Sequence, residues 1–417
     1  MIQDGNTADR PGSCRFCGGT LHAFVDLGMS PLCESFLAPE QLNGLERFYP
    51  LAAHVCGDCF LVQLQEYVAP EEIFTEYAYF SAFSDAWLDH ARRYADVMTS
   101  KLGLSASSRV VELGSNDGYL LQYFRAKGIS VLGIEPAVNV AAAAEKLGVP
   151  TRVKFFGAAT ARELVADGIQ ADLVVGNNVL AQVPDLNSFV EGIRIVLKTG
   201  GVCTVEFPHL LKTIVGNQFD QIYHEHFSYF SALTVERIFA VHGMRLFDIE
   251  ELWTHGGSLR IHACHAGFAG HPMQPSVAAL IAREREAGLD RLEIYAAFVH
   301  QVQATKRKLL SFLIDAKSRN KTIAGYGAPG KGNTLLNYCG IRTDFLDYTV
   351  DRNPYKHGKY LPGTHIPIFA PEKIAATKPD YVLILPWNLK DEIATQLAYI
   401  REWGAKFVVP IPEVSVF

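Results

Sequence analysis

Apolar positions change their spacing several times along this chain, and the changes mark successive elements. Between residues 109 and 208, short apolar runs alternate with helical stretches. The runs RVVELG, VLGIEP, ADLVVGNN and GGVCTVEFP predict strands, whereas helices are expected over about 118–127, over AVNVAAAAEKLG and over about 186–197. Strands that alternate with helices across short glycine turns indicate a parallel, doubly wound α/β sheet.

The same spacing argument divides the rest of the chain. Intervals of three and four from about Tyr77 to Leu102 predict a helix that leads into the sheet. Near the C-terminus, KTIAGYGAPGKG, FLDYTVDRNP, DYVLILPWN and AKFVVPIP predict a second α/β domain. We therefore expect a small β-rich module over residues 1–75, a sheet domain over 76–268, linking helices over 269–319 and a C-terminal domain over 320–417.

Two CxxC pairs lie in the first module: Cys14 and Cys17 in SCRFCGG, and Cys56 and Cys59 in VCGDC. Two such pairs supply the four thiolates of a tetrahedral zinc site. Two disulfides or a redox CxxC are the competing interpretations, but the first expects an exported protein and the second expects no matched second pair. The pattern favours structural zinc, and with four ligands filled the ion would take no part in catalysis.

Composition narrows the class of protein. A chain of 417 residues is too long for a single hydrophobic core, so we expect more than one domain. Its content of 49% hydrophobic and 20% charged residues is typical of a soluble globular protein. The formal net charge of −6 and the lack of a basic stripe argue against nucleic acid as a ligand. No run of about 18 apolar residues predicts a membrane span, and MIQDGNTADRPGS lacks the pattern of an export signal, so we expect a cytoplasmic protein.

The turn after the first strand of the sheet is acidic. In VVELGSNDGYLL it contains Glu112, Gly114, Asn116, Asp117 and Gly118, and its glycines have no Cβ that would obstruct a ligand. This is not the GxGxxG of a dinucleotide fold, and its carboxylates would repel a pyrophosphate. They would attract the cationic sulfonium and amino groups of S-adenosylmethionine (SAM). Charge therefore favours this methyl donor over NAD.

Two further strand ends share this edge of the predicted sheet. Glu135 ends the next strand in VLGIEP, where a carboxylate accepts hydrogen bonds from ribose hydroxyls, and Asn177 and Asn178 end ADLVVGNN. A turn selected only for its geometry is the competing interpretation of ELGSNDG. Three strand ends in one register favour a SAM site.

Titratable groups are concentrated in QIYHEHFSYFS, which contains Tyr223, His224, Glu225 and His226. Methylation of a carbon requires a carbanion, and an imidazole removes a proton beside a ketone where donors stabilise the resulting enolate. His226 would be the base and Tyr223 the donor. A helix start with surface histidines is a close alternative. A zinc pair in HEH is disfavoured, because histidines two residues apart lack the i, i+4 spacing of a helical pair.

Aromatic residues precede the sheet domain in TEYAYFS. Tyr77, Tyr79 and Phe80 would suit a pocket for sugar or adenosine, and equally an ordinary interface between domains. The sequence does not separate these two interpretations.

A glycine-rich loop opens the C-terminal domain. GYGAPGKGN offers successive backbone N–H groups together with Lys331 and Asn333, and the loop DRNPYKHGKYLPGTHIPI adds Asp351 at the same sheet edge. GKG lacks the hydroxyl residue that follows lysine in a Walker loop, so ATP hydrolysis is disfavoured. The diphosphate of a nucleotide sugar is the preferred ligand.

The order of these motifs resembles a known family. The paired knuckles, EYAYFS, VVELGSNDGYLL, GIEP, YHEHFSYFS and GYGAPGKGNTLLN are similar to those of the sugar C-methyltransferases that make branched deoxysugars for antibiotics, such as those acting on tetronitrose precursors. The resemblance covers essentially the whole chain. It implies a class I SAM-methyltransferase sheet flanked by an N-terminal zinc module and a C-terminal Rossmann-like domain that helps hold a dTDP-linked sugar. It also implies methyl transfer to C3 of a 4-keto sugar.

By this resemblance the family's base, the second histidine of YHEH, is His226, and the family's other site residues match Tyr223, Glu225 and Tyr77. The chain departs from the family in AQV, where Gln182 replaces a histidine expected to touch the substrate or assist proton movement. Glutamine carries no proton at neutral pH, so an acid/base role at this position is lost. Either the family histidine is auxiliary or this chain is impaired.

The expected function is therefore that of a SAM-dependent C-methyltransferase acting on a dTDP-3-amino-4-keto-deoxysugar as a monomer or weak oligomer. Two alternatives stay open. An O- or N-methyltransferase would need no enolate donor, and a non-catalytic nucleotide-sugar-binding or zinc-dependent interaction protein would keep the fold without the chemistry.

Overall fold

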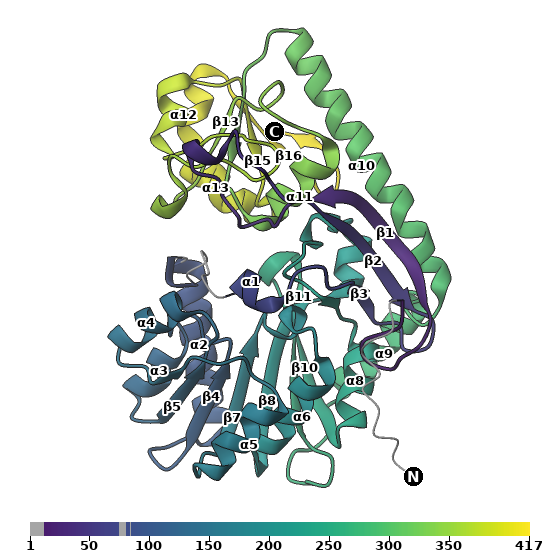
Figure 1. Cartoon of the computed structure of the whole chain (residues 1–417), viewed down its shortest axis with the longest axis vertical. Helices are drawn as coiled ribbons and strands as arrows, with labels where there is room; N and C mark the ends of the chain where they lie inside the picture. Colours follow the sequence, from purple (N-terminus) through teal and green to yellow (C-terminus); the bar gives the residue numbers. More distant parts are fainter. Residues whose placement is uncertain (1–11, 75–80, 84) are drawn as a thin grey trace. The chain divides into compact units, whose positions relative to one another are not determined.

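A computed structural model describes residues 12–74, 81–83 and 85–417. The chain divides into two compact units, each assembled from three stretches of sequence. The first unit comprises the residues up to 22, 55–210 and 227–292. The second unit comprises residues 23–54, 211–226 and 293–417. Figure 1 labels most of the helices and strands of both.

The first unit is built around a seven-stranded sheet with the order β10-β11-β8-β7-β4-β5-β6. The five strands from β8 to β6 are parallel, whereas β11 is antiparallel to both β8 and β10. Strand order reverses at β4, where doubly wound sheets bind their ligands. The strands are β4 (Arg109–Leu113), β5 (Ser130–Ile134), β6 (Thr151–Arg152), β7 (Ala171–Asn177), β8 (Leu197–Pro208), β10 (Met244–Leu252) and β11 (Ser258–His265).

Helices cover both faces of this sheet (Figure 1). Neighbouring strand residues point to opposite faces, and Val110 and Val111 accordingly belong to different buried clusters. Phe189 and Val235 join the Val111 cluster, and Phe124 joins the Val110 cluster. The helices are α2 (Asp85–Leu102), α3 (Leu121–Ala126), α4 (Val138–Lys146), α5 (Ala158–Ala166), α6 (Leu186–Val196), α8 (Ala232–Val241) and α9 (Pro275–Glu286).

These elements confirm the predicted doubly wound sheet. The three predicted helices between its strands are α3, α4 and α6. The helix predicted from about Tyr77 corresponds to α2, which begins at Asp85, and its expected positions 77–80 lie outside the described residues.

A second, four-stranded sheet has the order β1-β2-β3-β9. Its strands are β1 (Leu21–Ser30), β2 (Tyr49–Cys56), β3 (Val62–Leu64) and β9 (Ser228–Tyr229), and the short helix α1 (Pro70–Phe74) follows β3. Within the first unit, β3 pairs antiparallel with β9, with Val62 opposite Tyr229. The β-rich character predicted for the N-terminal module is therefore confirmed.

The second unit contains a six-stranded sheet with the order β14-β13-β12-β15-β16-β17, parallel except for β17. None of the described helices, not even the 27-residue α10, is long and apolar enough to span a bilayer. The strands are β12 (Ile323–Tyr326), β13 (Tyr348–Val350), β14 (Ile368–Phe369), β15 (Tyr381–Ile384), β16 (Lys406–Val409) and β17 (Ser415–Val416). The helices are α7 (Leu210–Val215), which begins at the unit boundary, α10 (Leu292–Ser318), α11 (Gly330–Cys339), α12 (Glu372–Thr377) and α13 (Lys390–Gln396).

Candidate active site

The four knuckle cysteines converge in the first unit. Cys14 Sγ lies 3.6 Å from Cys59 Sγ, Cys17 Sγ lies 3.5 Å from Cys56 Sγ, and all four sulfurs lie within 4.8 Å of one another. These separations are too long for disulfides, and they suit the edges of a tetrahedron around a zinc ion with Zn–S bonds of about 2.3 Å. The four thiols therefore fit the single structural zinc that their spacing predicted.

Hydrogen bonds to sulfur hold this arrangement. Gln63 Nε2 donates to Cys14 Sγ at 3.2 Å, and the backbone N–H of Asp58 donates to Cys56 Sγ at 3.4 Å. A Cβ at Gly19 would collide with the Asp58 carboxylate and with Cys56 Sγ. Glycine is thus required where the two knuckles approach each other.

The acidic turn after β4 is buried. Glu112 is 0% exposed, and neither of its carboxylate oxygens has a hydrogen-bond partner in the described part of the chain. Burial raises the pKa of Glu112 well above its usual value, and the nearby Tyr119 phenol offsets this rise only in part. A cation bound beside Glu112 would stabilise the ionised carboxylate, so the turn fits a positively charged ligand.

The two glycines of this turn adopt conformations that favour glycine. Gly114 has φ +62°, Gly118 has φ +79°, and both are left-handed positions that favour glycine. A Cβ at Gly114 would lie 3.0 Å from Val179, and one at Gly118 would lie 3.1 Å from Val149. Backbone conformation and packing against the protein thus add a second reason for glycine at both positions, and the close approach of a ligand stays a prediction.

The rest of the turn is tied to neighbouring backbone. Asn116 Oδ1 accepts from the N–H of Ser81 and Asp117 Oδ2 from the N–H of Ala82, each at 3.0 Å. Glu135 Oε2 accepts from the N–H of Asn116 at 2.8 Å, and its Oε1 accepts from the N–H two residues further on at 2.9 Å. A carboxylate oxygen accepts more than one hydrogen bond, so Glu135 retains capacity for ribose hydroxyls.

Two asparagines at the end of β7 complete this edge. Asn177 Nδ2 donates to the Tyr119 hydroxyl at 3.3 Å, and Asn178 Nδ2 donates to His255 Nε2 at 2.9 Å. The Oδ1 atoms of both asparagines are buried without a partner among the described residues, as is Ser115 Oγ. Buried acceptors without partners are costly, and a ligand carrying amino and hydroxyl groups would satisfy them.

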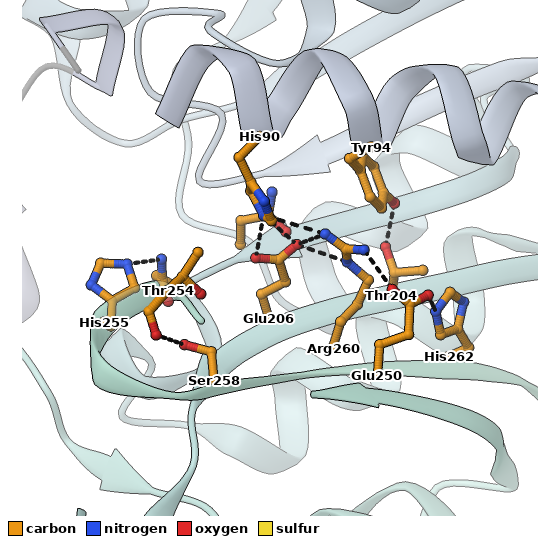
Figure 2. Close-up of polar contacts among 12 residues, drawn as sticks. His90, Tyr94, Thr204, Glu206, Glu250, Thr254, His255, Ser258, Arg260 and His262 are labelled. Atoms are coloured by element: carbon orange, nitrogen blue, oxygen red, sulfur yellow. Dashed lines mark hydrogen bonds and ion pairs between the residues drawn. The ribbon is translucent and has the colours of Figure 1, made fainter. Parts of the chain in front are cut away.

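Figure 2 shows a buried ion network in the first unit that the sequence analysis missed. It joins α2, β8, β10 and β11. Glu206 Oε1 accepts from Arg260 Nε at 2.7 Å, and His90 Nε2 lies 3.1 Å from Glu206 Oε2. Burial would raise the pKa of Glu206, but His90 and Arg260 together lower it below its usual value. Arg260 Nη1 also donates to Glu250 at 2.9 Å, and His262 Nε2 contacts the other oxygen of Glu250 at 2.7 Å.

The sequence did hold one signal for this network, because Glu206 is a charged residue in the largely apolar run GGVCTVEFP. The carbonyl of Glu206 accepts the N–H of Asn178 at 2.8 Å. The network is therefore joined directly to the sheet edge formed by Asn177 and Asn178, the asparagine edge.

The reactive segment lies in the second unit. The rings of Tyr223 and His226 are 4.1 Å apart between centroids, and His226 is 7% exposed. Burial lowers the pKa of His226 to about 4; the backbone carbonyl of Gln221 opposes this shift, and the charge of Lys331 adds to it. Glu225 is also buried and accepts a hydrogen bond from Cys33 Sγ at 3.4 Å. The alternative of surface histidines is therefore wrong.

His224 has a structural environment. Its Nε2 donates to the carbonyl of Pro50 at 3.1 Å, and its ring meets the edge of Tyr49 at 5.9 Å. Among the described residues, the groups able to hold a metal are the four cysteines and a set formed by Asp248, Glu250 and His262, and neither contains the histidines of HEH.

The glycine-rich loop of the second unit is anchored on both sides. Asp351 Oδ2 accepts from the N–H of Ala328 at 2.7 Å, which fixes the loop that precedes α11. Lys331 Nζ donates to Asn388 Oδ1 at 2.8 Å and lies 5.1 Å from the centroid of the Trp387 ring. Asn333 is 1% exposed, and both ends of its amide lack a partner among the described residues.

The structure does not place every predicted residue. Tyr77, Tyr79 and Phe80 lie outside the described residues. Gln182 ends a short 3-10 turn (Leu180–Gln182) in the first unit, and its N–H donates to the carbonyl of Val179 at 2.9 Å. The residues predicted to bind the methyl donor thus lie in the first unit. The predicted residues of the second unit are Tyr223, Glu225, His226, Lys331, Asn333 and Asp351.

Three family models match successive parts of the chain. They are described as "Putative zinc binding domain" over residues 14–74, "Methyltransferase domain" over residues 87–248 and "C-methyltransferase C-terminal domain" over residues 253–412. The chain is also 36% identical over 404 residues to the C-methyltransferase NovU of Streptomyces niveus, covering 97% of this chain and 96% of that protein.

The chain belongs to the C-methyltransferase family. This C-methyltransferase uses SAM, for which the buried acceptors at the ends of β4 and β7 provide a fitting site, and its four cysteines form a zinc site. Similar solved structures include a SAM-dependent methyltransferase from Clostridium acetobutylicum ATCC 824, with 12% identity, TM-score 0.35 and coverage of 45% of this chain and 94% of that one. Magnesium protoporphyrin IX methyltransferase from Synechocystis PCC 6803 has 14% identity, TM-score 0.32 and coverage of 43% and 82%.

Proposed function

We propose that this C-methyltransferase transfers the methyl group of SAM to C3 of a dTDP-linked 3-amino-4-keto-deoxysugar. The observation that carries the proposal is the contact between the buried His226 imidazole and the half-buried Tyr223 ring at 4.1 Å. A neutral imidazole accepts a proton, and an adjacent phenol stabilises a developing enolate oxygen. Both groups needed to generate a carbanion therefore lie within four residues of sequence.

In the proposed reaction His226 takes the proton from C3 of the sugar. The electron pair of the broken C–H bond enters an enolate with its negative oxygen at C4, to which the Tyr223 hydroxyl donates. SAM supplies an electrophilic methyl group. C3 then forms a bond to the methyl carbon while the carbon–sulfur bond breaks with its electron pair on sulfur, which leaves S-adenosylhomocysteine (SAH) and the methylated sugar.

The surroundings of His226 support its role as base. Burial lowers its pKa to about 4, so the ring is neutral at pH 7. The backbone carbonyl of Gln221 faces the ring and favours a proton on the nitrogen that points to it. The other ring nitrogen then carries the lone pair that accepts the substrate proton.

The nucleotide end of the substrate is assigned to the loop before α11. Lys331 is half-buried, and burial lowers the pKa of its ammonium group although Asp220 opposes this shift; a bound diphosphate would stabilise the charged form. Asn333 offers a buried donor and a buried acceptor with no partner among the described residues. Both oxygens of Asp351 accept backbone N–H groups, at 2.7 and 2.8 Å, and like those of Glu135 they retain capacity for a further donor, so Asp351 stays assigned to the substrate site. We assign Tyr77 and Glu225 to the catalytic site on the strength of the family resemblance.

Two measurements test this function. Incubation with SAM and a dTDP-3-amino-4-keto-deoxysugar is expected to yield SAH and a sugar heavier by one methyl group, and NMR should place that methyl on C3. A methyl on oxygen or nitrogen would contradict carbon methylation. In deuterated buffer without SAM, exchange of the C3 proton reports the base alone.

Gln182 allows a matched comparison. If the histidine usual at this position is auxiliary, wild type and Gln182→His will turn over at rates within a few fold of each other. A large gain in Gln182→His would mean that the natural chain is impaired, and no turnover by either would refute the proposed reaction.

A further inference from the structure

His255 has a left-handed backbone conformation. It lies between β10 and β11 with φ +54°, followed by Gly256 at +88° and Gly257 at +119°. Its hydrogen-bond partner Asn178, directly after β7, is also left-handed at φ +56°. Left-handed non-glycine residues are uncommon, although asparagine and histidine adopt this conformation more readily than most, and they concentrate at functional sites.

Aromatic packing holds the imidazole in place. The ring of Trp87 meets His255 edge-on, with centroids 5.6 Å apart, and stacks on Tyr119 with centroids 6.0 Å apart. The Tyr119 hydroxyl accepts from Asn177 Nδ2 at 3.3 Å. Figure 2 shows that the turn itself is closed by Ser258 Oγ, which donates to the carbonyl of Thr254 at 2.9 Å. His255 is therefore fixed beside the asparagine edge.

We propose that His255 is a positioning residue that fixes the orientation of the Asn178 side-chain amide for recognition of the α-amino group of SAM. The 2.9 Å contact joins Asn178 Nδ2 to His255 Nε2, so the amide donates and the imidazole nitrogen accepts. The amide has one donor end and one acceptor end. With Nδ2 committed to His255, Oδ1 must face the other way.

That oxygen is the useful atom. Asn178 Oδ1 is buried and has no partner among the described residues, and a donor group of a bound ligand would satisfy it. The α-amino group of SAM is a cationic donor, and the acidic turn with Glu112 belongs to the same sheet edge. A reversed amide would instead present N–H groups to that cation and repel it. This inference rests on the proposed assignment of Asn178 to the SAM site.

Calorimetry on the full chain tests the inference with two ligands: SAH and its deaminated analogue, in which hydrogen replaces the α-amino group. His255→Phe keeps an aromatic edge against Trp87 but removes the acceptor. We expect it to bind SAH about tenfold more weakly than wild type, a loss typical of one hydrogen bond to a charged group. Its affinity for the deaminated analogue should change less than threefold.

His255→Asn is the matched control, because asparagine tolerates the left-handed backbone and retains an acceptor. It should bind SAH within about threefold of wild type. Equal losses of both ligands in His255→Phe would assign His255 to the fold alone and overturn the inference, as would unchanged SAH binding. Failure of wild type to bind SAH would instead contradict the proposed donor site.

A spectroscopic measurement covers the case in which His255→Phe does not fold. Nitrogen-15 NMR of histidine-labelled wild type should show His255 with its proton on Nδ1 and a bare Nε2. A proton on Nε2 would overturn the proposal, since that nitrogen would then face Asn178 as a donor.

Discussion

The indole N–H of Trp387 donates a 2.7 Å hydrogen bond to Asp220 Oδ2. Asp220 lies three residues before the reactive tyrosine, and Trp387 follows β15 of the C-terminal sheet. Thr334 Oγ1 on α11 adds a second tie at 3.1 Å to the carbonyl of Ile222. The segment with the proposed base is therefore fastened to the sheet that carries the proposed diphosphate loop, within one unit of the structure.

Asp220 makes stability depend on pH. Burial raises its pKa to about 6, although Lys331 and Trp387 oppose the rise. A carboxyl whose pKa is higher in the folded than in the unfolded state favours folding when protonated. The buried ionised Asp220 therefore destabilises the folded state above pH 6, and acidification removes this destabilisation. Relative to Asp220→Asn, wild type should gain about 1 kcal/mol in unfolding free energy between pH 8 and pH 5. Urea denaturation at both pH values measures this difference, and a constant gap would contradict it.

Replacement of the base should stop proton removal. His226→Asn is expected to lower C3 deuterium exchange at least a thousandfold and to abolish methylation, because His226 is the proposed base and its ring lies 4.1 Å from that of the proposed donor Tyr223. The control is His224→Asn, because His224 is hydrogen-bonded to the carbonyl of Pro50. This variant should keep the exchange rate, corrected for the amount of folded protein, within a few fold of wild type. Exchange that persists in His226→Asn would assign the proton removal to another group.

The same base predicts a pH profile. Because burial lowers the pKa of His226 to about 4, its neutral form is complete above pH 5. The exchange rate should be insensitive to this group between pH 5 and 8 and should fall tenfold per pH unit below about pH 4. NMR measurements of exchange over a short pH series would reveal a midpoint near 6.5 if the imidazole were instead exposed to water.

The zinc site should stabilise the fold without affecting the reaction directly. We expect one zinc per chain in wild type, and loss of that zinc together with several kcal/mol of unfolding free energy in Cys59→Ser. Cys203→Ala is the control, because Cys203 is buried in the sheet of the same unit and is no ligand. Metal analysis and thermal denaturation report the outcome; full zinc content in Cys59→Ser would disprove the four-cysteine site.

Removal of one partner of the buried ion pair should lower the free energy of unfolding more than removal of both. Arg260→Met leaves Glu206 as a buried charge without its guanidinium, at an expected cost of about 3–5 kcal/mol. The double variant Arg260→Met/Glu206→Gln should recover part of that loss. Equilibrium denaturation of the three proteins tests the coupling.

Glu250 adds a pH dependence to the same network. The pKa of Glu250 is lowered to about 2, first by its hydrogen bond with His262. Its contribution to the free energy of unfolding is therefore present above about pH 4.5 and is lost as pH falls through 2.

Many residues of the zinc site and of the candidate SAM site were predicted from short sequence motifs. The two CxxC pairs defined the zinc ligands, because the required ligand number and spacing are properties of a few adjacent residues. Glu112, Glu135, Asn177 and Asn178 were located by strand ends, since parallel strands bring their carboxyl ends to one edge. The domain limits near residues 75, 268 and 319 stay predictions, because the two compact units are each built from three separate stretches.

His255 and the Glu206 network escaped the sequence analysis for one reason. Each depends on partners more than 50 residues away: Asn178 for His255, and His90 and Arg260 for Glu206. No spacing rule in a single sequence relates such positions.

The sequence by itself determined which chemistry is present: four thiolates, an acidic turn and the YHEH segment, each encoded by short-range order. Only the tertiary structure decided what each group does. Burial turned His226 into a neutral imidazole while the similar His224 became a structural donor to Pro50. The reason is physical, because desolvation and hydrogen-bond partners are set by residues distant in sequence, and these determine protonation state and orientation.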